Sequence, residues 1–325
     1  MKTTARKPGG PLAGLLLWSA LAAAVAVALA GLLADLHYVF DLGAQFAAPA
    51  FSLSLLFAFF ALLLHRNRAM AGLLLAALAL FLNLRPQWFP PEPQPKVVWG
   101  VKPAKVYFAN VWARNERLAD LAFSIAEADA DVVAMVEVSP LHAEHMKLLL
   151  DRYPYQFKTN ASPNGGARTL IASRFPLKAT DRGFQDGLAV LEARVMAPDR
   201  PFRLVAVHLT RPWPFYDPHV QRRQTESLIR RVHRGDPETT VVVGDFNATG
   251  SGALLRDFRE RAHLRMAPAI AGTWPSVAPA ALRLGIDNAF AGEDLALINR
   301  RLGLPNGSDH RPIVFQVAPA EPRRR

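Results

Sequence analysis

Three long stretches without a charged side chain fill most of the first 85 residues, and they constrain the fold more than any other feature. The first, residues 12–33, has 22 residues and would form a helix about 33 Å long at ~1.5 Å per residue. Because the hydrocarbon core of a membrane is ~30 Å thick, this stretch predicts a membrane-spanning helix. A cleaved signal peptide is the alternative, since Lys2, Arg6 and Lys7 precede the stretch, but the apolar core of such a peptide is shorter, about 7 to 15 residues.

Two further apolar stretches predict two more spans in a membrane region that covers residues 1–85. Residues 46–64 are rich in Leu and Phe, with Pro49 near the start, where a helix tolerates proline. Residues 69–84 form a shorter run of 16 that carries Asn83, so we expect this to be the weakest of the three spans.

The positions of the cations predict the orientation, because Lys and Arg in short loops stay in the cytoplasm. The N-terminus is basic, the loop at 35–45 has no Lys or Arg, and the next loop contains Arg66 and Arg68. With three spans, the chain after residue 85 lies on the extracytoplasmic side of the cell inner (cytoplasmic) membrane. If the third stretch does not span, the same part lies in the cytoplasm.

Residues 86–104 contain six prolines, too many for a helix or a central strand. Two interpretations stay open for this linker: a stiff, extended spacer, or an ordered loop at the edge of the following domain.

Composition narrows the chemistry of the remaining part. The chain has no cysteine, which excludes disulfides, thiolate catalysis and Cys-ligated zinc. Of the formal net charge of +11, the membrane region carries +4, which leaves +7 on residues 86–325. A basic surface suits a polyanionic partner such as nucleic acid or anionic lipid, but it also serves solubility. Arg323, Arg324 and Arg325, in a basic tail at 319–325, supply three of these charges.

From residue 105 the pattern changes to strands alternating with helices. We expect strands at 106–111, 131–138, 168–173, 188–196, 203–209, 241–243 and 311–317, and helices at 116–128, 141–153, 219–233 and 253–262. Apolar strands with outer helices predict an α/β fold in which two packed β-sheets are flanked by helices, a four-layer sandwich preceded by three transmembrane helices. The histidines within the expected helices, His142 among them, are interpreted as surface groups.

The strand at 241–243 ends in Gly244-Asp245-Phe246-Asn247. Side chains repeat every second residue along a strand, so Asp245 and Asn247 emerge on the same side. Taken alone, Asp and Asn after a strand are also common turn formers.

Other strands of this part also end in polar groups. Asn110, Glu137 and His208 close three of them, Asp287 follows Gly285-Ile286, and Ser308-Asp309-His310 precedes the last strand. Each of these residues singly has a structural explanation, as a cap, a buried histidine or a turn residue.

Taken together and in this order, these residues resemble the endonuclease/exonuclease/phosphatase (DNase I-like) family, in particular a membrane-anchored bacterial branch. The resemblance covers residues 105–318, expected to be the catalytic domain, and its specific motifs are Gly244-Asp245-Phe246-Asn247 and Ser308-Asp309-His310. The stretch from Gly165-Gly166-Ala167-Arg168 to Ser173-Arg174 also looks like a strand of that family.

The resemblance implies a Mg²⁺-dependent phosphoric ester hydrolase, with Mn²⁺ as a possible substitute. It implies Glu137 as the main metal ligand, with Asn110 and Asp309 beside it, and Asp245 as the group that orients and deprotonates the attacking water. Further implied roles are water or phosphate binding for Asn247, charge stabilisation for His208 and His310, orientation of His310 for Asp287, and substrate binding for Asn115 and Arg168. The family often has an aromatic residue or His after Asp287, where this chain has Asn288.

The substrate class stays open between nucleic acid, a phospholipid headgroup and an inositol phosphate. The positive charge favours nucleic acid, whereas the membrane spans and Trp213-Pro214-Phe215-Tyr216 favour lipid, unless that loop is ordinary packing before the next helix. A function of a different class also stays open: the protein could be a non-catalytic, membrane-anchored binding module that has kept the fold.

Overall fold

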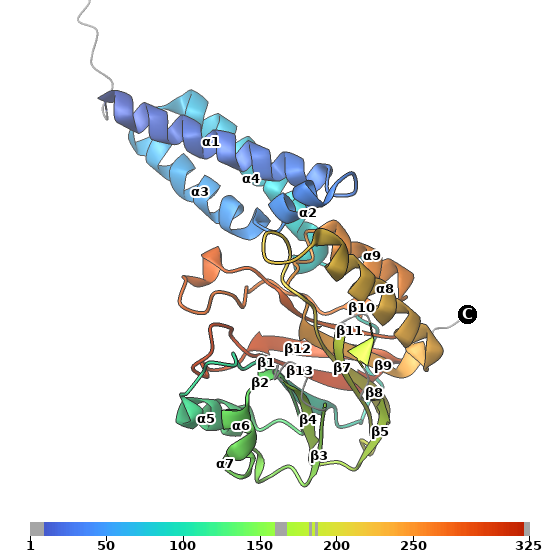
Figure 1. Ribbon diagram of the computed structural model, residues 1–325. Helices are drawn as coiled ribbons and strands as arrows, with labels where there is room; N and C mark the ends of the chain where they lie inside the picture. The colour runs from blue at the N-terminus through green and yellow to red at the C-terminus, as the bar shows by residue number, and fades with distance from the viewer. Residues whose placement is uncertain (1–9, 160–167, 182–183, 186–187, 322–325) are drawn as a thin grey trace, which may run out of the picture. The chain divides into compact units, whose positions relative to one another are not determined.

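A computed structural model describes residues 10–159, 168–181, 184–185 and 188–321 (Figure 1). The N-terminal cations, the glycines at 165 and 166 and the last four residues of the tail lie outside these ranges. The chain divides into two compact units: Met1–Pro86 with Gly250–Ala253, and Gln87–Thr249 with Leu254–Arg325.

The first unit is helical and apolar. Its helices are α1 (Gly10–Leu32), α2 (Tyr38–Ala44), α3 (Ala47–Leu63) and α4 (Asn67–Trp88). Helices α1 and α4 are each long and apolar enough to cross a membrane, and α2 with α3, bent by 51°, forms a third candidate.

The third apolar stretch forms part of a longer helix than its own 16 residues suggest. Helix α4 has 22 residues, whereas α3 has only 17. The helix continues past the apolar run at both ends, because its backbone hydrogen bonds do not require apolar side chains.

The proline-rich segment shows the second of the two alternatives, an ordered loop, over residues 94–98. Gln94 donates to the carbonyl of Met266 at 3.0 Å and accepts from the backbone N–H of Leu297 at 2.8 Å. Val98 donates its N–H to the carbonyl of Pro319 at 3.1 Å. These bonds hold the segment against the domain, so it is not a free spacer.

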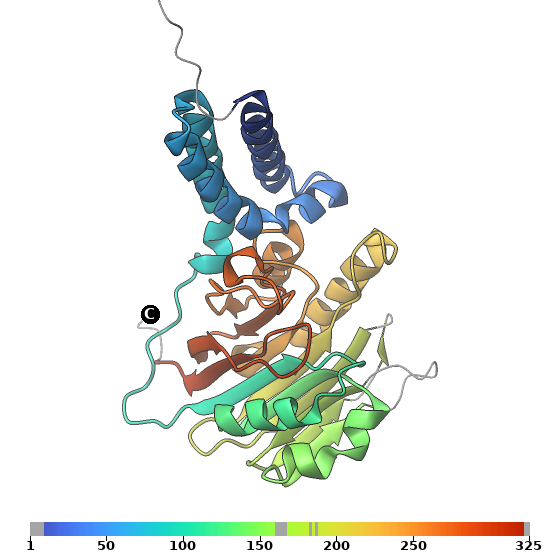
Figure 2. The ribbon, with the colours of Figure 1, turned by 90° about the vertical axis from the view of Figure 1, so that its left-hand side faces the viewer.

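Two mixed β-sheets form the second unit, as the fold class predicts (Figures 1 and 2). The six-stranded sheet has the order β12 (Leu295–Leu302), β13 (Ile313–Pro319), β1 (Ala104–Asn110), β2 (Val132–Val138), β4 (Arg168–Ser173) and β3 (Tyr155–Lys158). The seven-stranded sheet has the order β10 (Arg265–Met266), β11 (Asp287–Ala291), β9 (Thr240–Asp245), β8 (Phe202–His208), β7 (Leu188–Val195) and β5 (Leu177–Asp181). Its seventh strand, β6 (Phe184–Gln185), pairs with β7.

Apolar side chains fill three layers between these elements. One cluster lies between the sheets and includes Phe108, Leu204 and Phe315. A second packs α8 (Pro218–Arg234) and α9 (Ala253–Arg261) on the seven-stranded sheet, and a third packs α5 (Leu118–Ala128) and α7 (Met146–Leu150) on the six-stranded sheet. Figure 2 shows α5 to α7, in green, over that sheet. Strands β1, β2, β8 and β9 are thus buried on both faces, which explains their continuous apolar runs.

The expected helix at 141–153 is instead two short helices, α6 (Pro140–Glu144) and α7. The N-cap Ser139 and His142 form a reciprocal capping box, so His142 is fully buried rather than a surface group. Its Nε2 lies 3.0 Å from the carbonyl oxygen of Asn115.

Strand pairing brings the polar strand ends to one place. β1 and β2 run parallel, as do β8 and β9, and His208 pairs with Asp245 across the second pair. Asp287, at the start of β11, is the antiparallel partner of Asp245. Polar residues far apart in the sequence therefore meet at one edge of the stacked sheets.

Candidate active site

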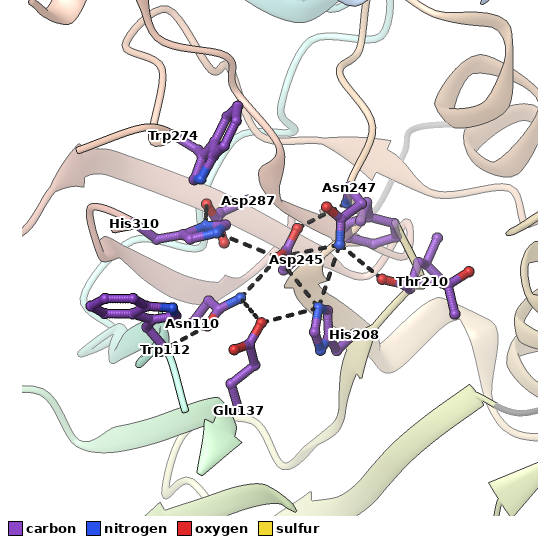
Figure 3. A network of polar contacts seen from close by, with 12 residues as sticks. Asn110, Trp112, Glu137, His208, Thr210, Asp245, Asn247, Trp274, Asp287 and His310 are labelled. Atoms are coloured by element: carbon purple, nitrogen blue, oxygen red, sulfur yellow. Dashed lines mark hydrogen bonds and ion pairs between the residues drawn. The ribbon is translucent and has the colours of Figure 1, made fainter. Parts of the chain in front are cut away.

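Asn110 joins the two sheets within a network of polar side chains that has Asp245 at its centre (Figure 3). Its amide Nδ2 donates to Glu137 Oε1 at 3.0 Å and to Asp245 Oδ2 at 2.9 Å. Its Oδ1 accepts from the backbone N–H of Trp112 at 2.9 Å, and its carbonyl accepts from Ser308 Oγ at 2.8 Å. With both ends of the side chain bonded, Asn110 is held in one orientation between two carboxylates.

A β-bulge directs Glu137 into this network. The β2–β4 register shifts between Met135 and Val138, and Glu137 has a left-handed backbone with φ of 57°. Without the extra residue, Glu137 would follow Val133 and Met135 onto the face covered by helices. Non-glycine residues rarely adopt this backbone, and such strain concentrates at functional sites.

Glu137 accepts hydrogen bonds at both carboxylate oxygens. In addition to the amide of Asn110, the backbone N–H of Ala113 donates to Oε2 at 3.1 Å. Burial alone would raise the pKa of Glu137, but the charge of His208 and these hydrogen bonds outweigh burial and hold the pKa below its usual value. Glu137 is therefore an ionised carboxylate at neutral pH.

Asp245 is almost fully buried and lies close to two histidines. Its Oδ2 lies 3.5 Å from His208 Nε2 and 3.7 Å from His310 Nε2. Burial raises the pKa of Asp245, and the nearby Asp287 carboxylate raises it further, against the opposing effect of the two histidines. A raised pKa makes Asp245 a better proton acceptor than an exposed aspartate.

His310 and Asp287 form a hydrogen-bonded pair next to Asp245. His310 Nδ1 lies 2.9 Å from Asp287 Oδ2, and both side chains are buried. Burial alone would lower the pKa of His310, but Asp287 and Asp245 outweigh burial and raise the pKa to about 10. At neutral pH His310 is an imidazolium whose Nδ1–H donates to Asp287.

Asn247 closes the network on the other side of Asp245. Its backbone N–H donates to Asp245 Oδ1 at 2.8 Å, and its Nδ2 donates to the carbonyl of Leu209 at 2.9 Å. The same Nδ2 lies 3.4 Å from His208 Nε2. The structure thus unites seven predicted site residues: Asn110, Glu137, His208, Asp245, Asn247, Asp287 and His310.

Three other predicted site residues lie outside this network. The Asp309 carboxylate is directed at Trp274, whose indole N–H donates to Oδ2 at 3.2 Å. Asn115 is buried and donates to the carbonyl of Asn306 at 3.0 Å, which ties two loops together. Arg168 is half-buried at the start of β4 and pairs with Val138. Their roles in metal and substrate binding stay predictions.

Asn288, the departure from the family pattern, is fully buried behind the site. Its Nδ2 donates to the carbonyl of Gly285 at 3.0 Å and lies 3.4 Å from that of Ala248. It thus links the loops that precede β11 and follow β9.

Two tryptophans at the site were not anticipated. Figure 3 shows Trp112 and Trp274 beside His310 and Asn110. Trp112 lies two residues after Asn110, the last residue of β1, so its sequence position gave a signal for it. Trp274 lies 13 residues before Asp287 in an irregular loop, and no pattern in the sequence marks it.

The carboxylates of the site fit a divalent metal ion. Asp245, Asp287 and His310 place ligand atoms within 4.8 Å of one another, but His310 supplies a positive charge there itself. Glu137 is ionised and its side chain is 15% exposed, so its oxygens are the more accessible ones. Hard oxygen ligands of this kind suit Mg²⁺, which keeps several waters and takes one or two carboxylates.

The Endonuclease/Exonuclease/phosphatase family model matches residues 107–310. A search of the curated proteins gives no match to this chain. Among solved structures, an endonuclease/exonuclease/phosphatase from Beutenbergia cavernae DSM 12333 is similar with 18% identity, a TM-score of 0.54 and coverage of 68% of this chain and 72% of that one. A family protein from Bacteroides vulgatus has 15% identity, a TM-score of 0.56 and coverage of 67% and 100%. D. rerio TDP2, complexed with a single strand DNA product, has 17% identity, a TM-score of 0.51 and coverage of 67% and 99%.

The chain belongs to the endonuclease/exonuclease/phosphatase family. Members of this family are generally hydrolases of phosphoric esters and typically use a divalent metal ion. The family resemblance inferred from the strand-end residues is thereby confirmed, as is the two-sheet fold.

Proposed function

We propose that this protein is a membrane-tethered, Mg²⁺-dependent phosphodiesterase that acts on nucleic acid. The observation that carries the proposal is the network around Asn110, in which two carboxylates of different protonation behaviour lie beside an imidazolium. Hydrolysis of a phosphodiester needs a proton acceptor for water and positive charge for the phosphate oxygens. This network offers both.

Each residue has a role that follows from its contacts. Asp245, with its raised pKa, accepts the proton of the attacking water, and Asn247, bonded to Asp245, orients that water or a phosphate oxygen. The imidazolium of His310 stabilises the negative charge that develops on the phosphate. Glu137, with Asn110 and Asp309, would hold the metal ion, which polarises the phosphate and stabilises the leaving alkoxide when bound.

Nucleic acid is the favoured substrate because the part after residue 85 carries a net charge of +7. A duplex presents one charge per ~1.7 Å, so lysine and arginine contacts would give strong, salt-dependent binding. The D. rerio neighbour, solved with a single strand DNA product, shows that a similar scaffold accommodates DNA.

A lipid headgroup is the second candidate, and one observation favours it. Trp213, Phe215 and Tyr216, in the loop between β8 and α8, are 52%, 68% and 54% exposed. About half or more of each side chain is therefore open to solvent, which favours a binding role for this loop over ordinary packing. Exposed aromatic side chains of this kind suit a membrane interface.

The two candidates separate in one experiment on the full chain purified in detergent. Single-stranded DNA, duplex DNA and phospholipid vesicles are each incubated with Mg²⁺, and product release is measured for the parent and for a variant with Trp213, Phe215 and Tyr216 replaced by serine. We expect DNA cleavage that survives the triple replacement and falls with added salt. Headgroup release that the replacement abolishes, without DNA cleavage, would overturn the nucleic-acid assignment in favour of lipid.

We also propose that the catalytic part lies on the extracytoplasmic side of the inner membrane. Because the chain has no native cysteine, a single Ala320→Cys replacement gives a clean label site. A membrane-impermeant maleimide should label this variant in cells whose outer barrier is opened. Labelling only after lysis would place the domain in the cytoplasm.

A further inference from the structure

Arg300, in strand β12, places a charged side chain on the face between the two sheets. Leu295 and Leu297 of the same strand belong to the core between the sheets, and Leu302 packs against it. Because side chains alternate along a strand, Arg300 shares the face of Leu302. A cation on an inter-sheet face is costly without a partner, so its placement calls for an explanation.

A β-bulge produces this placement. In the β12–β13 ladder Ile298 pairs with Gln316 and Arg301 with Val314, so Asn299 and Arg300 together oppose one residue. Asn299 has a left-handed backbone with φ of 55°. Without the extra residue, Asn299 and Arg301 would face the core and Arg300 would point to the opposite side. The bulge in β2 that directs Glu137 into the site is a second instance of the same device.

The partner of Arg300 is Asp287, the residue that pairs with His310. Arg300 Nη2 donates to the carbonyl oxygen of Asp287 at 3.1 Å. Within the described residues, Arg300 Nε and Asp287 Oδ1 are both shielded from solvent and lack a hydrogen-bond partner. Burial lowers the pKa of Arg300 to about 10, with the Asp287 charge opposing the shift, so the guanidinium keeps its charge at neutral pH.

We propose that Arg300 is a positioning residue of the active site, which fixes Asp287 from the opposite sheet and thereby orients His310 toward the phosphate. Arg300 holds the main chain at the start of β11 through the Asp287 carbonyl, and its charge attracts the Asp287 carboxylate. The carboxylate in turn holds Nδ1 of His310, so Nε2 faces Asp245. This role rests on the proposed phosphodiesterase function, because it is through His310 that the positioning affects turnover.

The test compares three variants of the full chain in detergent with bis(p-nitrophenyl) phosphate as substrate. Arg300→Gln should lower kcat about tenfold to a hundredfold, the usual effect of removing a group that orients a catalytic side chain, while KM changes less than about twofold. Arg300→Lys should recover most of kcat because it keeps the charge. Arg301→Gln, an exposed neighbour on the other side of the strand, is the matched control and should match the parent.

A double-mutant cycle with Asp287→Asn separates positioning from general destabilisation. If Arg300 acts through Asp287, adding Arg300→Gln to Asp287→Asn should change kcat less than about twofold. Additive losses, or an Arg300→Gln variant with the kcat of the parent, would overturn the proposal.

An NMR measurement tests the positioning role of Arg300 independently of the proposed phosphodiesterase function. In full chain with labelled histidine, the ring signal of His310, assigned with His310→Gln, should shift in Arg300→Gln and stay unchanged in Arg301→Gln. A parent without phosphodiesterase activity would refute the function, yet the His310 signal would still decide the positioning. An unshifted signal in an active parent would refute the positioning alone.

Discussion

The two carboxylates that share the amide of Asn110 come from different sheets and have different environments. Glu137, from the six-stranded sheet, has a side chain 15% exposed, whereas Asp245, from the seven-stranded sheet, is 1% exposed. Hydrogen bonds and His208 lower the pKa of Glu137 despite burial, but burial dominates at Asp245 and raises its pKa. Carboxyl groups whose environments push their pKa values apart typically take different roles. The difference supports the proposal that Glu137 binds the metal ion and Asp245 accepts the proton.

The largest effect is expected from removing the ionised carboxylate of this pair. Glu137→Ala should reduce kcat/KM on a phosphodiester by about a thousandfold, because the charge stabilisation by a metal is worth several kcal/mol. A chelator should abolish activity in the parent, and added Mg²⁺ or Mn²⁺ should restore it. Glu127→Ala, at an exposed position of α5, is the control and should behave as the parent. Full activity of the parent in chelator would contradict the metal assignment.

A smaller loss is expected from removing the amide that the two carboxylates share. Asn110→Ala should lower kcat/KM by about tenfold to a hundredfold, because Glu137 and Asp245 each lose a donor that orients them. Asn110→Asp should be worse than Asn110→Ala at low Mg²⁺, because a third carboxylate adds repulsion, and high Mg²⁺ should narrow the gap. Steady-state kinetics over a range of Mg²⁺ concentrations measure both effects; identical Mg²⁺ dependence of the two variants would contradict the shared-amide interpretation.

A third, pH-dependent effect should appear in stability rather than in rate. The pKa of His310 is raised from about 6.5 to about 10 in the folded protein, so protonated His310 stabilises the fold fully below pH about 6.5. This contribution should disappear as the pH rises through about 10. The difference in melting temperature between the parent and His310→Gln should therefore shrink from pH 6.5 to 10.

Thermal unfolding in detergent, followed by circular dichroism, measures this difference. The control is His219→Gln, at an exposed position of α8, whose difference from the parent should not depend on pH in the same way. A difference for His310→Gln that grows with pH would show that the imidazolium does not stabilise this site.

Much of the architecture followed from local patterns. The strand at 168–173 was predicted with the bounds that the structure has, and the long apolar strands were placed to within one or two residues at each end. Strands β3, β5, β6, β10, β11 and β12 were missed. Most of them are short, and in β12 the apolar start, residues 295–298, is followed by three polar residues. In β12, Asn299-Arg300-Arg301 resembles a loop, and only pairing with β13 makes it a strand.

The sequence by itself determined which residue types take part in the chemistry, because polar groups at the ends of apolar strands must emerge at a sheet edge. It did not determine which of them meet. Asp309 turned toward Trp274, and Asn115 and His142 became buried links between loops, since their partners lie 27 to 191 positions away in the chain. The two bulges that direct Glu137 and Arg300 depend on the register between strands, a tertiary quantity that no local pattern contains. The pKa differences within the site likewise arise from burial and from neighbouring charges, which exist only after the sheets have packed.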